Sequence, residues 1–445
     1  MAHTSLLTRA EIERLGPPVP EELSETVVPT GFLCDLALKV IAILPDQTTT
    51  AVADHLGLPR MLTEDLLQRL YREKLVEVRG QTTMGATRYA MLERGWERVI
   101  RLQSVCGYIG PAPVSLADYT HMVQLQAVPV RPATIDRVRA AMSDLVLPDS
   151  LLQTLGYVVS SRRSLFLTGP PGTGKTAVSE RINGGLDGTI WIPYAIEIDG
   201  QVIRVFDAHM HRPVPEGATL TEYDRRWVRI QRPLIVVAGE LTLENADLQW
   251  SEVSRFYEAP FQMKANGGTL VVDDFGRQRV QPQDLLNRWI LPLERRIDFL
   301  TLHTGKKIEV PFEQLLIFST NLEERDLVDE AFLRRLGYRA RLEPPTPDAY
   351  IEIFRRAAAA RNITVNQACY AHILNNYLIE DRQMKACEPR DLLDRIADIC
   401  LFEGRAFEVT SELIDLAWRN YFGASHGFTT QSAGSIVVSH AHFEV

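Results

Sequence analysis

The sequence predicts an α/β fold in which a core built on a parallel sheet lies between two mainly helical segments. Over residues 140–342, short apolar strand-like runs alternate with helical stretches, which is typical of a parallel sheet covered by helices. Residues 30–102 show helical spacing interrupted by two short alternating runs, and residues 348–422 show helical spacing almost throughout. At roughly 100–200 residues per domain, the 445 residues allow two to four domains.

The first segment, residues 1–105, is expected to form a domain of its own. Apolar residues recur at helical spacing from Phe32 to Leu44, and two further helical runs follow. The short alternating strands VEVRG and ATRYAML then precede a closing helix that starts at Glu93. This order of elements resembles a winged-helix domain.

The remaining boundaries follow from changes in composition. Residues 106–139 are punctuated by Pro and Gly and are expected to be a linker. The core, residues 140–342, is expected to contain the strands SLFLTG, TIWIP, LIVVAG, TLVVDD and LLIFSTN. Residues 343–424 are expected to form a separate helical domain, and residues 425–445 a tail rich in Ser, Gly and His.

Composition excludes several classes of protein. The hydrophobic fraction of 45% and the charged fraction of 24% are those of a globular chain. No apolar run approaches the ~20 residues of a membrane helix, and the N-terminus lacks the apolar stretch of a secretory signal. The five cysteines never form a C-x-x-C pair, which argues for reduced thiols and against a zinc site. We therefore expect a cytoplasmic protein without membrane insertion.

The strongest motif is GPPGTGKT, which fits the phosphate-binding pattern G-x-x-x-x-G-K-[ST], here called the P-loop. An apolar strand enters it and a helical run leaves it. Backbone N–H groups of such a loop surround the phosphates of ATP, Lys175 reaches the β- and γ-phosphates, and Thr176 supplies an oxygen to Mg²⁺. The alternative is a Gly-rich turn without a ligand. The candidate cofactor-binding residues are Gly169, Pro170, Pro171, Gly172, Thr173, Gly174, Lys175 and Thr176.

Polar side chains end two later strands. The run GGTLVVDDFG ends in Asp273 and Asp274, and LLIFSTN ends in Asn321. We expect Asp273 to join Thr176 on the metal side, and Asp274 to polarise the attacking water. Asn321 would sense the γ-phosphate or orient that water. A solvated loop after a buried strand is the alternative for the acidic pair.

The order of P-loop, acid, asparagine, arginines and helical domain resembles the AAA+ ATPases over roughly residues 140–420. The resemblance implies a P-loop AAA+ module in which residues 343–424 form an α-helical lid. In AFLRRLGYRARL it implies an arginine finger, Arg335 or, as the alternative, Arg334, that acts on the nucleotide of a neighbouring subunit. In CEPRDLLDRI it places Arg390 over the nucleotide. A finger of this kind makes the protein a homo-oligomer, expected to be a hexameric ring.

Within this family, FQMKANGGTLVVDDFGRQRVQPQDLLNRWI is similar to bacterial enhancer-binding activators and MoxR-type ATPases. Asp274 departs from the pattern, because the family has Glu there, and the shorter side chain could slow hydrolysis. The aromatic pore loop of threading unfoldases and the sigma-contacting motif of the activators are both missing. Activation of transcription through that contact is therefore not expected.

Two hairpins are also predicted, over residues 195–207 around Asp199–Gly200 and over residues 297–311. The first could engage a partner. His209 and His211 follow it, and an H-x-H pair without a further ligand is more simply a polar hairpin base than a metal site.

The winged helix leaves the partner open. Residues 60–101 contain nine basic and six acidic residues, which suits a DNA surface, but Glu64 and Asp65 lie early in the presumed recognition helix. A winged helix that docks a protein or caps an oligomer is at least as favoured as one that binds DNA. We expect an ATP-hydrolysing motor that remodels a protein partner or complex. The alternatives are a DNA-associated ATPase or regulator, for which DNA binding is the less favoured reading, and a slow nucleotide-gated scaffold.

Overall fold

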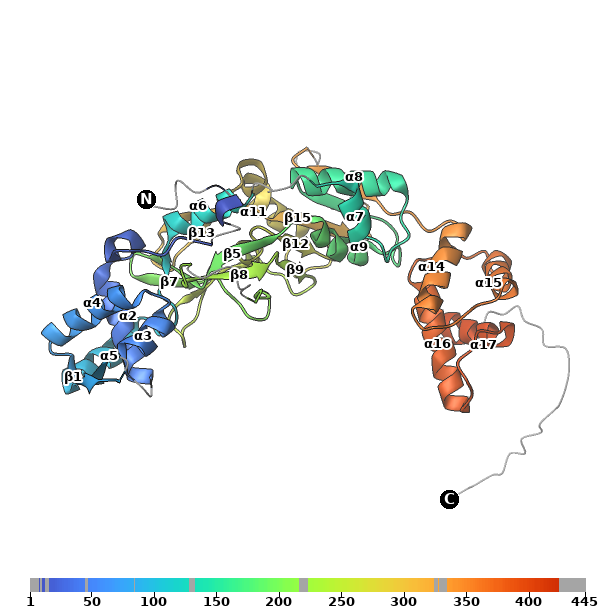
Figure 1. The fold of residues 1–445 in the computed structure, drawn as a ribbon. Coiled ribbons are helices and arrows are strands. Elements are labelled where there is room, and N and C mark those ends of the chain that lie inside the picture. Colours follow the sequence, from blue (N-terminus) through green and yellow to red (C-terminus); the bar gives the residue numbers. More distant parts are fainter. Residues whose placement is uncertain are drawn as a thin grey trace, which may run out of the picture. The chain divides into compact units, whose positions relative to one another are not determined.

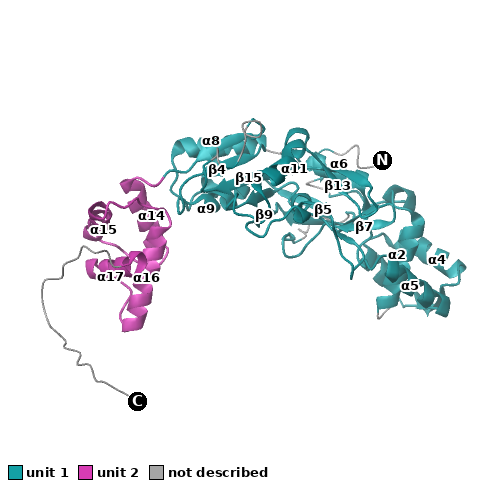
Figure 2. Cartoon of the chain, turned by 180° about the vertical axis from the view of Figure 1, so that it is seen from behind, with its two compact units in different colours: residues 1–343 teal, residues 344–445 magenta. Residues whose placement is uncertain are grey.

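The computed structural model describes residues 8, 10–12, 16–44, 47–83, 85–127, 133–215, 223–323, 327 and 334–423. The chain divides into two compact units, Met1–Glu343 and Pro344–Val445 (Figures 1 and 2). The expected tail, residues 425–445, lies outside the described residues. No helix in the described ranges is long and apolar enough to cross a membrane.

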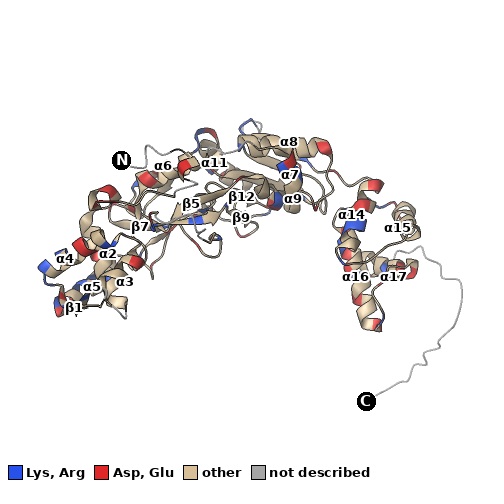
Figure 3. Cartoon of the chain, in the orientation of Figure 1, with Lys and Arg blue, Asp and Glu red and all other residues tan. Residues whose placement is uncertain are grey.

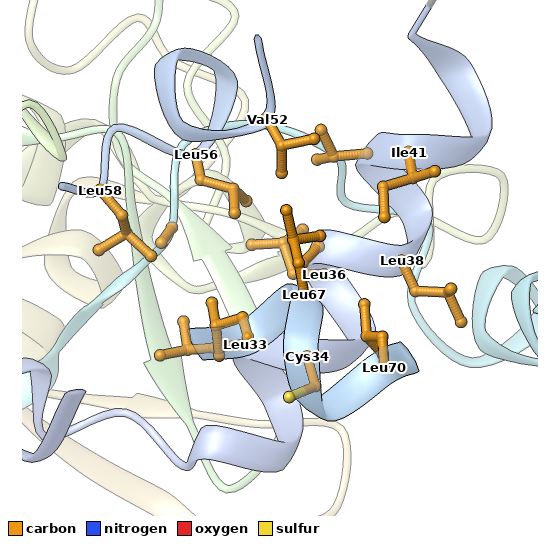
Figure 4. Packing of buried hydrophobic residues seen from close by; sticks show 14 of the residues in the cluster. Leu33, Cys34, Leu36, Leu38, Ile41, Val52, Leu56, Leu58, Leu67 and Leu70 are labelled. Carbon is orange, nitrogen blue, oxygen red and sulfur yellow. The ribbon is translucent and has the colours of Figure 1, made fainter. Parts of the chain in front are cut away.

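The N-terminal elements of the first unit follow the predicted order of three helices, a two-stranded antiparallel sheet and a closing helix. Charged residues of both signs lie on α4 and α5 (Figure 3), whereas apolar side chains of α2, α3 and α4 meet in a shared interior (Figure 4). Local signals set the ends of α3: the Thr48 side chain accepts from Ala51 N, and Gly57 takes the left-handed conformation. The elements are α2 (Thr30–Ile43), α3 (Thr49–Leu56), α4 (Arg60–Arg72), β1 (Val76–Gln81), β2 (Thr87–Met91) and α5 (Glu93–Val105), after the 3-10 turn η2 (Leu23–Thr26).

These helices do not form an isolated domain. Their apolar cluster also contains Ala195, Val202 and Phe256, which belong to the middle of the chain. Lys39 is buried, and its Nζ donates to the carbonyl oxygens of Cys106 and Tyr108 at 3.0 and 2.7 Å. The shared interior and the two hydrogen bonds from buried Lys39 explain why these helices belong to the same compact unit as the core.

The expected linker, residues 106–139, is instead largely folded. It contains β3 (Val114–Ser115), α6 (Leu116–Ala127) and the start of α7 (Ile135–Ala141). Tyr119 and Met122 of α6 are buried in the same cluster as Ile196 and Ile203. Pro and Gly gave this stretch the composition of a linker, but its apolar residues at helical spacing form the buried face of a helix.

A five-stranded parallel sheet forms the centre of the first unit, in the order β16-β4-β15-β12-β9. Alternate residues of β15 face opposite sides: Ile317 packs in the cluster that contains α8 and α9, and Phe318 packs in the one that contains α11. Both faces are therefore buried, as expected for a parallel sheet. The elements are α8 (Asp149–Ser161), β4 (Leu165–Thr168), α9 (Lys175–Arg181), η3 (Ile182–Gly185), β9 (Leu234–Val237), β12 (Thr269–Val272), α11 (Pro282–Arg295), β15 (Leu315–Thr320) and β16 (Tyr338–Arg341).

All five predicted core strands are confirmed as strands, and four of them lie in this sheet. TIWIP is strand β5 (Thr189–Pro193), but it pairs antiparallel with β8 (Trp227–Gln231) in a separate two-stranded sheet. The fifth place is taken by β16, in a stretch that the sequence analysis assigned to the arginine finger and the crossing into the helical domain. A period-2 pattern identifies a strand but not its partner, so the pairing of TIWIP with β8 could not be predicted from it.

Both predicted hairpins are confirmed. The first joins β6 (Ala195–Ile198) to β7 (Gln201–Arg204), with Asp199 and Gly200 both at positive φ. It belongs to a second five-stranded sheet, β10-β11-β7-β6-β3, and only its tip and Arg204 are exposed. A partner could therefore reach the tip and Arg204, and Asp199 at the tip contacts Lys306 of the second hairpin. The other elements here are η4 (Glu244–Ala246), β10 (Gln249–Trp250), β11 (Tyr257–Glu258), α10 (Phe261–Lys264), β13 (Ile297–Thr301) and β14 (Lys307–Pro311).

The second unit is helical, as expected. Its helices are α14 (Pro347–Ala359), α15 (Gln367–Ile379), α16 (Glu388–Glu403) and α17 (Ser411–Phe422). They enclose a cluster that includes Phe354, Tyr377, Leu393 and Trp418. Side-chain caps from Thr346, Asn366 and Thr410 start three of these helices.

Candidate nucleotide-binding site

The P-loop follows β4, whose four residues are all buried. Gly169, Gly172 and Gly174 have φ values of +148°, +81° and +98°. L side chains rarely adopt these angles, so the glycines let the chain turn sharply between the strand and the helix. Helix α9 begins directly after the loop, at Lys175. The local structure is therefore that of a phosphate-binding turn between a strand and a helix.

Lys175 is held against the loop. Its Nζ donates to the carbonyl oxygens of Gly169 and Pro170, both at 2.9 Å, and the residue is only 8% exposed. Burial lowers the pKa of Lys175, and the charges of Asp273 and Asp274 oppose that shift. The two carboxylates therefore favour the cationic form that a phosphate would need.

A hydroxyl–carboxylate contact joins the loop to the acidic strand. Thr176 Oγ1 donates to Asp273 Oδ2 at 2.7 Å, although β15 lies between β4 and β12 in the sheet. Both are hard oxygen donors of the kind that Mg²⁺ takes. Among the described residues there is no group of three or more His, Cys, Asp or Glu side chains that could hold a metal by itself. Mg²⁺ usually binds through one or two protein oxygens together with water and phosphate oxygens, and Thr176 and Asp273 could supply those protein oxygens.

Asp274 follows Asp273 at the end of the same strand and is exposed. Its φ is +48°, in the left-handed region, and its carbonyl oxygen accepts from Arg277 N at 3.0 Å. The chain thus turns sharply at Asp274, so that this carboxylate does not continue the line of β12. An exposed carboxylate beside a metal-side acid can accept a proton from water.

Asn321 comes directly after β15, the strand between the P-loop strand and the acidic strand. Its Oδ1 is buried and has no hydrogen-bond partner in the described part of the chain. Thr320, by contrast, is fully buried, and its hydroxyl donates to Phe275 O at 2.7 Å. Of these two polar residues, Asn321 is therefore the one with capacity left for a ligand, and Thr320 has a structural role.

The parallel sheet brings the ends of these strands to one edge. Thr168 is in register with Thr320, and Val272 with Phe318, so the P-loop, Asn321 and the acidic pair all leave the sheet at the same level. Ligands in open parallel sheets bind at such carboxyl ends.

The three candidate arginines lie in exposed or partly exposed positions outside the P-loop. Arg335 pairs with the carboxylate of Glu294 on α11, and Arg334 is exposed; both precede β16. Arg390 lies in the first turn of α16 in the second unit, with a 68% exposed side chain 3.2 Å from Asp391. Their roles as arginine finger and nucleotide contact stay predictions.

His211 has a structural role. Its Nδ1 accepts from Asp207 N at 3.0 Å, and its Nε2 donates to Lys264 O at 2.9 Å. Because Nδ1 accepts an N–H, it carries no proton and the ring is neutral, and burial lowers the pKa of His211. With both nitrogens used, the interpretation as a polar hairpin base is favoured over a metal site.

One contact at the site was not predicted. The side-chain amide of Gln278 bonds to the backbone on both sides of Asp274. No signal in the sequence distinguishes this glutamine, because it lies in the polar run GRQRVQPQ with two others.

A family profile described as "Domain of unknown function (DUF8689)" matches residues 346–420. No curated protein matches the chain.

Among solved structures, the chain is similar to NtrX from Brucella abortus in complex with ADP, with 14% identity and a TM-score of 0.38 over 62% of this chain and 56% of that one. It is also similar to the RuvB Holliday junction branch migration motor of Thermotoga maritima, with 15% identity and a TM-score of 0.36 over 62% of this chain and 69% of that one. The chain thus spans 56% of the length of NtrX. At such low scores, any assignment of function depends on the residues of the site.

Proposed function

We propose that this chain is a Mg²⁺-dependent ATPase of the AAA+ type. The observation that carries the proposal is the 2.7 Å bond between Thr176 Oγ1 and Asp273 Oδ2. It joins a phosphate-binding loop to an acidic strand across an intervening strand that ends in Asn321. A Gly-rich turn without a ligand would not require this alignment.

The residues divide the chemistry among them. The backbone of the loop and Lys175 hold the phosphates, and Thr176 with Asp273 would hold Mg²⁺, which supplies charge stabilisation at the transferred phosphate. Asp274 would accept the proton of the attacking water, and the free Oδ1 of Asn321 can accept a hydrogen bond from that water and orient it. Arg335 of a neighbouring subunit and Arg390 would stabilise the developing charge.

We further propose that the chain assembles into a ring, expected to be hexameric, and remodels a protein partner or complex. Support for the ring comes from Arg335, which lies next to an edge strand of the sheet rather than within its interior. Its guanidinium is held by Glu294, so the side chain has a defined direction before any neighbour arrives.

Steady-state ATP turnover of the full chain tests the proposal. Lys175→Ala and Asp273→Ala should each lower turnover by about 100-fold or more, because each removes a group that faces the phosphates or Mg²⁺. Lys307→Ala, which alters an exposed lysine on β14, is the matched control. Turnover by Lys175→Ala at the rate of the unaltered chain would rule out this site.

A second function, binding of duplex DNA by the N-terminal helices as a winged helix, gains support from Glu64. Its carboxylate accepts from Thr49 Oγ1 and from the Tyr89 hydroxyl, both at 2.7 Å. Glu64 is therefore used within the domain, which weakens the objection that it would repel phosphates. Of the two acids, only Asp65 is fully exposed on α4.

Because the N-terminal helices share an interior with the core, DNA binding is best tested on the full chain. A labelled duplex should bind at low salt, and the affinity should fall as salt rises if phosphates are contacted. Arg69→Glu together with Arg72→Glu should weaken it further. Absence of binding at low salt would exclude this function.

A further inference from the structure

The turn that follows β12 is closed by one side chain. Gln278 Nε2 donates to the carbonyl oxygen of Asp273 at 2.9 Å, and Gln278 Oε1 accepts from Gly276 N at 2.8 Å. A single amide therefore bonds to the backbone on both sides of Asp274.

The opposite side of the turn is fixed by β15. Phe275 N donates to Ser319 O, and Phe275 O accepts from Thr320 Oγ1, both at 2.7 Å. The Phe275 ring is fully buried. The backbone around Asp274 is thus anchored to the sheet at Phe275, and to Gln278 at Asp273 and Gly276.

Asp274 lies at a sharp turn of the chain. Its φ of +48° is in the left-handed region, which Asp adopts more readily than most non-glycine residues, so the hydrogen bonds around it fix the direction of the turn. The carboxylate itself is exposed, so its direction depends on the backbone that carries it.

We propose that Gln278 is a positioning residue for Asp274 and, through it, for the attacking water. The inference rests on the proposed ATPase function. Gln278 touches neither the P-loop nor Thr176 in its two side-chain bonds, so its effect should fall on the chemical step rather than on nucleotide binding.

Substitutions separate the two bonds. Gln278→Ala removes both. Gln278→Glu keeps an acceptor for Gly276 N but loses the donor to Asp273 O. Because small displacements of a reacting group can cost up to about 100-fold in rate, we expect kcat for ATP to fall about 10- to 100-fold in both variants, with KM within about 2-fold.

The test measures kcat, KM for ATP and the urea midpoint of the full chain and its variants. Gln283→Ala, on the exposed face of α11, is the matched control and should leave kcat unchanged. Gln278→Ala is also placed in an Asp274→Asn background, where a positioning role predicts no further loss of kcat. A merely structural role would lower kcat there as well, together with the urea midpoint.

The results distinguish a failure of the proposed ATPase function from a failure of the proposed role of Gln278. Absence of turnover by the unaltered chain overturns the proposed function and this inference with it. Turnover by the unaltered chain, combined with an unchanged kcat in Gln278→Ala and Gln278→Glu, overturns this inference alone. The same holds if kcat and KM change in equal proportion, or if the loss persists in the Asp274→Asn background.

Discussion

Gly169 is a position of the P-loop that leaves no room for a side chain. A Cβ added there would lie closer than 3.0 Å to the carbonyl oxygen of Leu342, whereas ordinary contacts begin at about 3.4 Å. Leu342 is buried, and its N–H donates to Thr168 O at 2.8 Å, so it cannot retreat without loss of that bond. The φ of +148° adds strain for any L side chain.

The contact with Leu342 and the backbone strain together set the free energy of unfolding that Gly169→Ala is expected to lose. A residue held in a sparsely populated backbone region costs about 1–3 kcal/mol, and a lost backbone hydrogen bond costs about 1 kcal/mol more. Gly174→Ala is the matched control, because its φ is +98° but nothing lies within 4 Å of an added Cβ. Only the first term applies to it.

Urea unfolding without nucleotide, followed by tryptophan fluorescence, measures both variants. Of the six tryptophans, only Trp418 lies in the second unit, so the signal reports mainly on the first. Gly169→Ala should be less stable than Gly174→Ala by at least about 1 kcal/mol. Equal destabilisation of the two variants would refute the reasoning from the Leu342 contact.

Three further predictions concern the site and its surroundings. Arg335→Ala should lower ATP turnover by about 10³–10⁵-fold while nucleotide binding is retained. If Arg334→Ala shows that loss and Arg335→Ala turns over ATP normally, Arg334 is the arginine finger. Asp274→Asn should lower turnover by about 10²–10⁴-fold in a motor and leave a measurable residual rate. A large gain of turnover in Asp274→Glu would instead favour a slow nucleotide-gated scaffold, and steady-state ATPase rates distinguish these outcomes. Burial lowers the pKa of His211 below 6.5. As the pH falls below about 6.5, the unfolded chain therefore binds a proton at this histidine that the folded chain does not bind. The free energy of unfolding should then fall by up to about 1.4 kcal/mol per pH unit. His211→Gln should show a shallower decline between pH 7 and 5 in urea titrations, and an unchanged slope would contradict this role.

The sequence was sufficient for the parts of the site that depend on short-range patterns. The P-loop, the acidic pair and Asn321 each follow an apolar run, and a buried strand that ends in polar residues is recognisable without its neighbours. The hairpin at Asp199–Gly200 was also predictable, because its turn chemistry is local.

The pairing of strands was not predictable in the same way. TIWIP and TLVVDD look alike as apolar runs, but only the second joins the parallel sheet. Strand β16 was missed because YRAR is short and half charged, and it is held in place by its pairing with β4 rather than by its own composition. Such choices depend on long-range contacts that local propensity does not contain.

Burial of polar groups was equally outside the reach of the sequence. Glu64 appeared to face a partner, but its two short bonds to Thr49 and Tyr89 direct it inward. Gln278 appeared to be one polar residue among several, although its amide spans the turn at Asp274. In each case the partner is a group whose position is set by a different element.

The attachment of the N-terminal helices bears on what the chain can do with ATP. Val202 on β7 packs in the same cluster as α2, and five residues further on the carboxylate of Asp207 pairs with Lys264 of α10 at 2.8 Å. Helix α10 leads through the Gly267–Gly268 turn into β12, which ends at the acidic pair.

A continuous series of packed elements therefore connects the N-terminal helices with the acidic strand. A tethered recruiting domain would lack such a series, so a change at the nucleotide could not reach it through the fold. Contiguity alone does not demonstrate coupling, since coupling requires an element with two states that both sites bias. It does place the N-terminal helices in the same compact unit as the candidate nucleotide-binding site, rather than on a separate tethered domain.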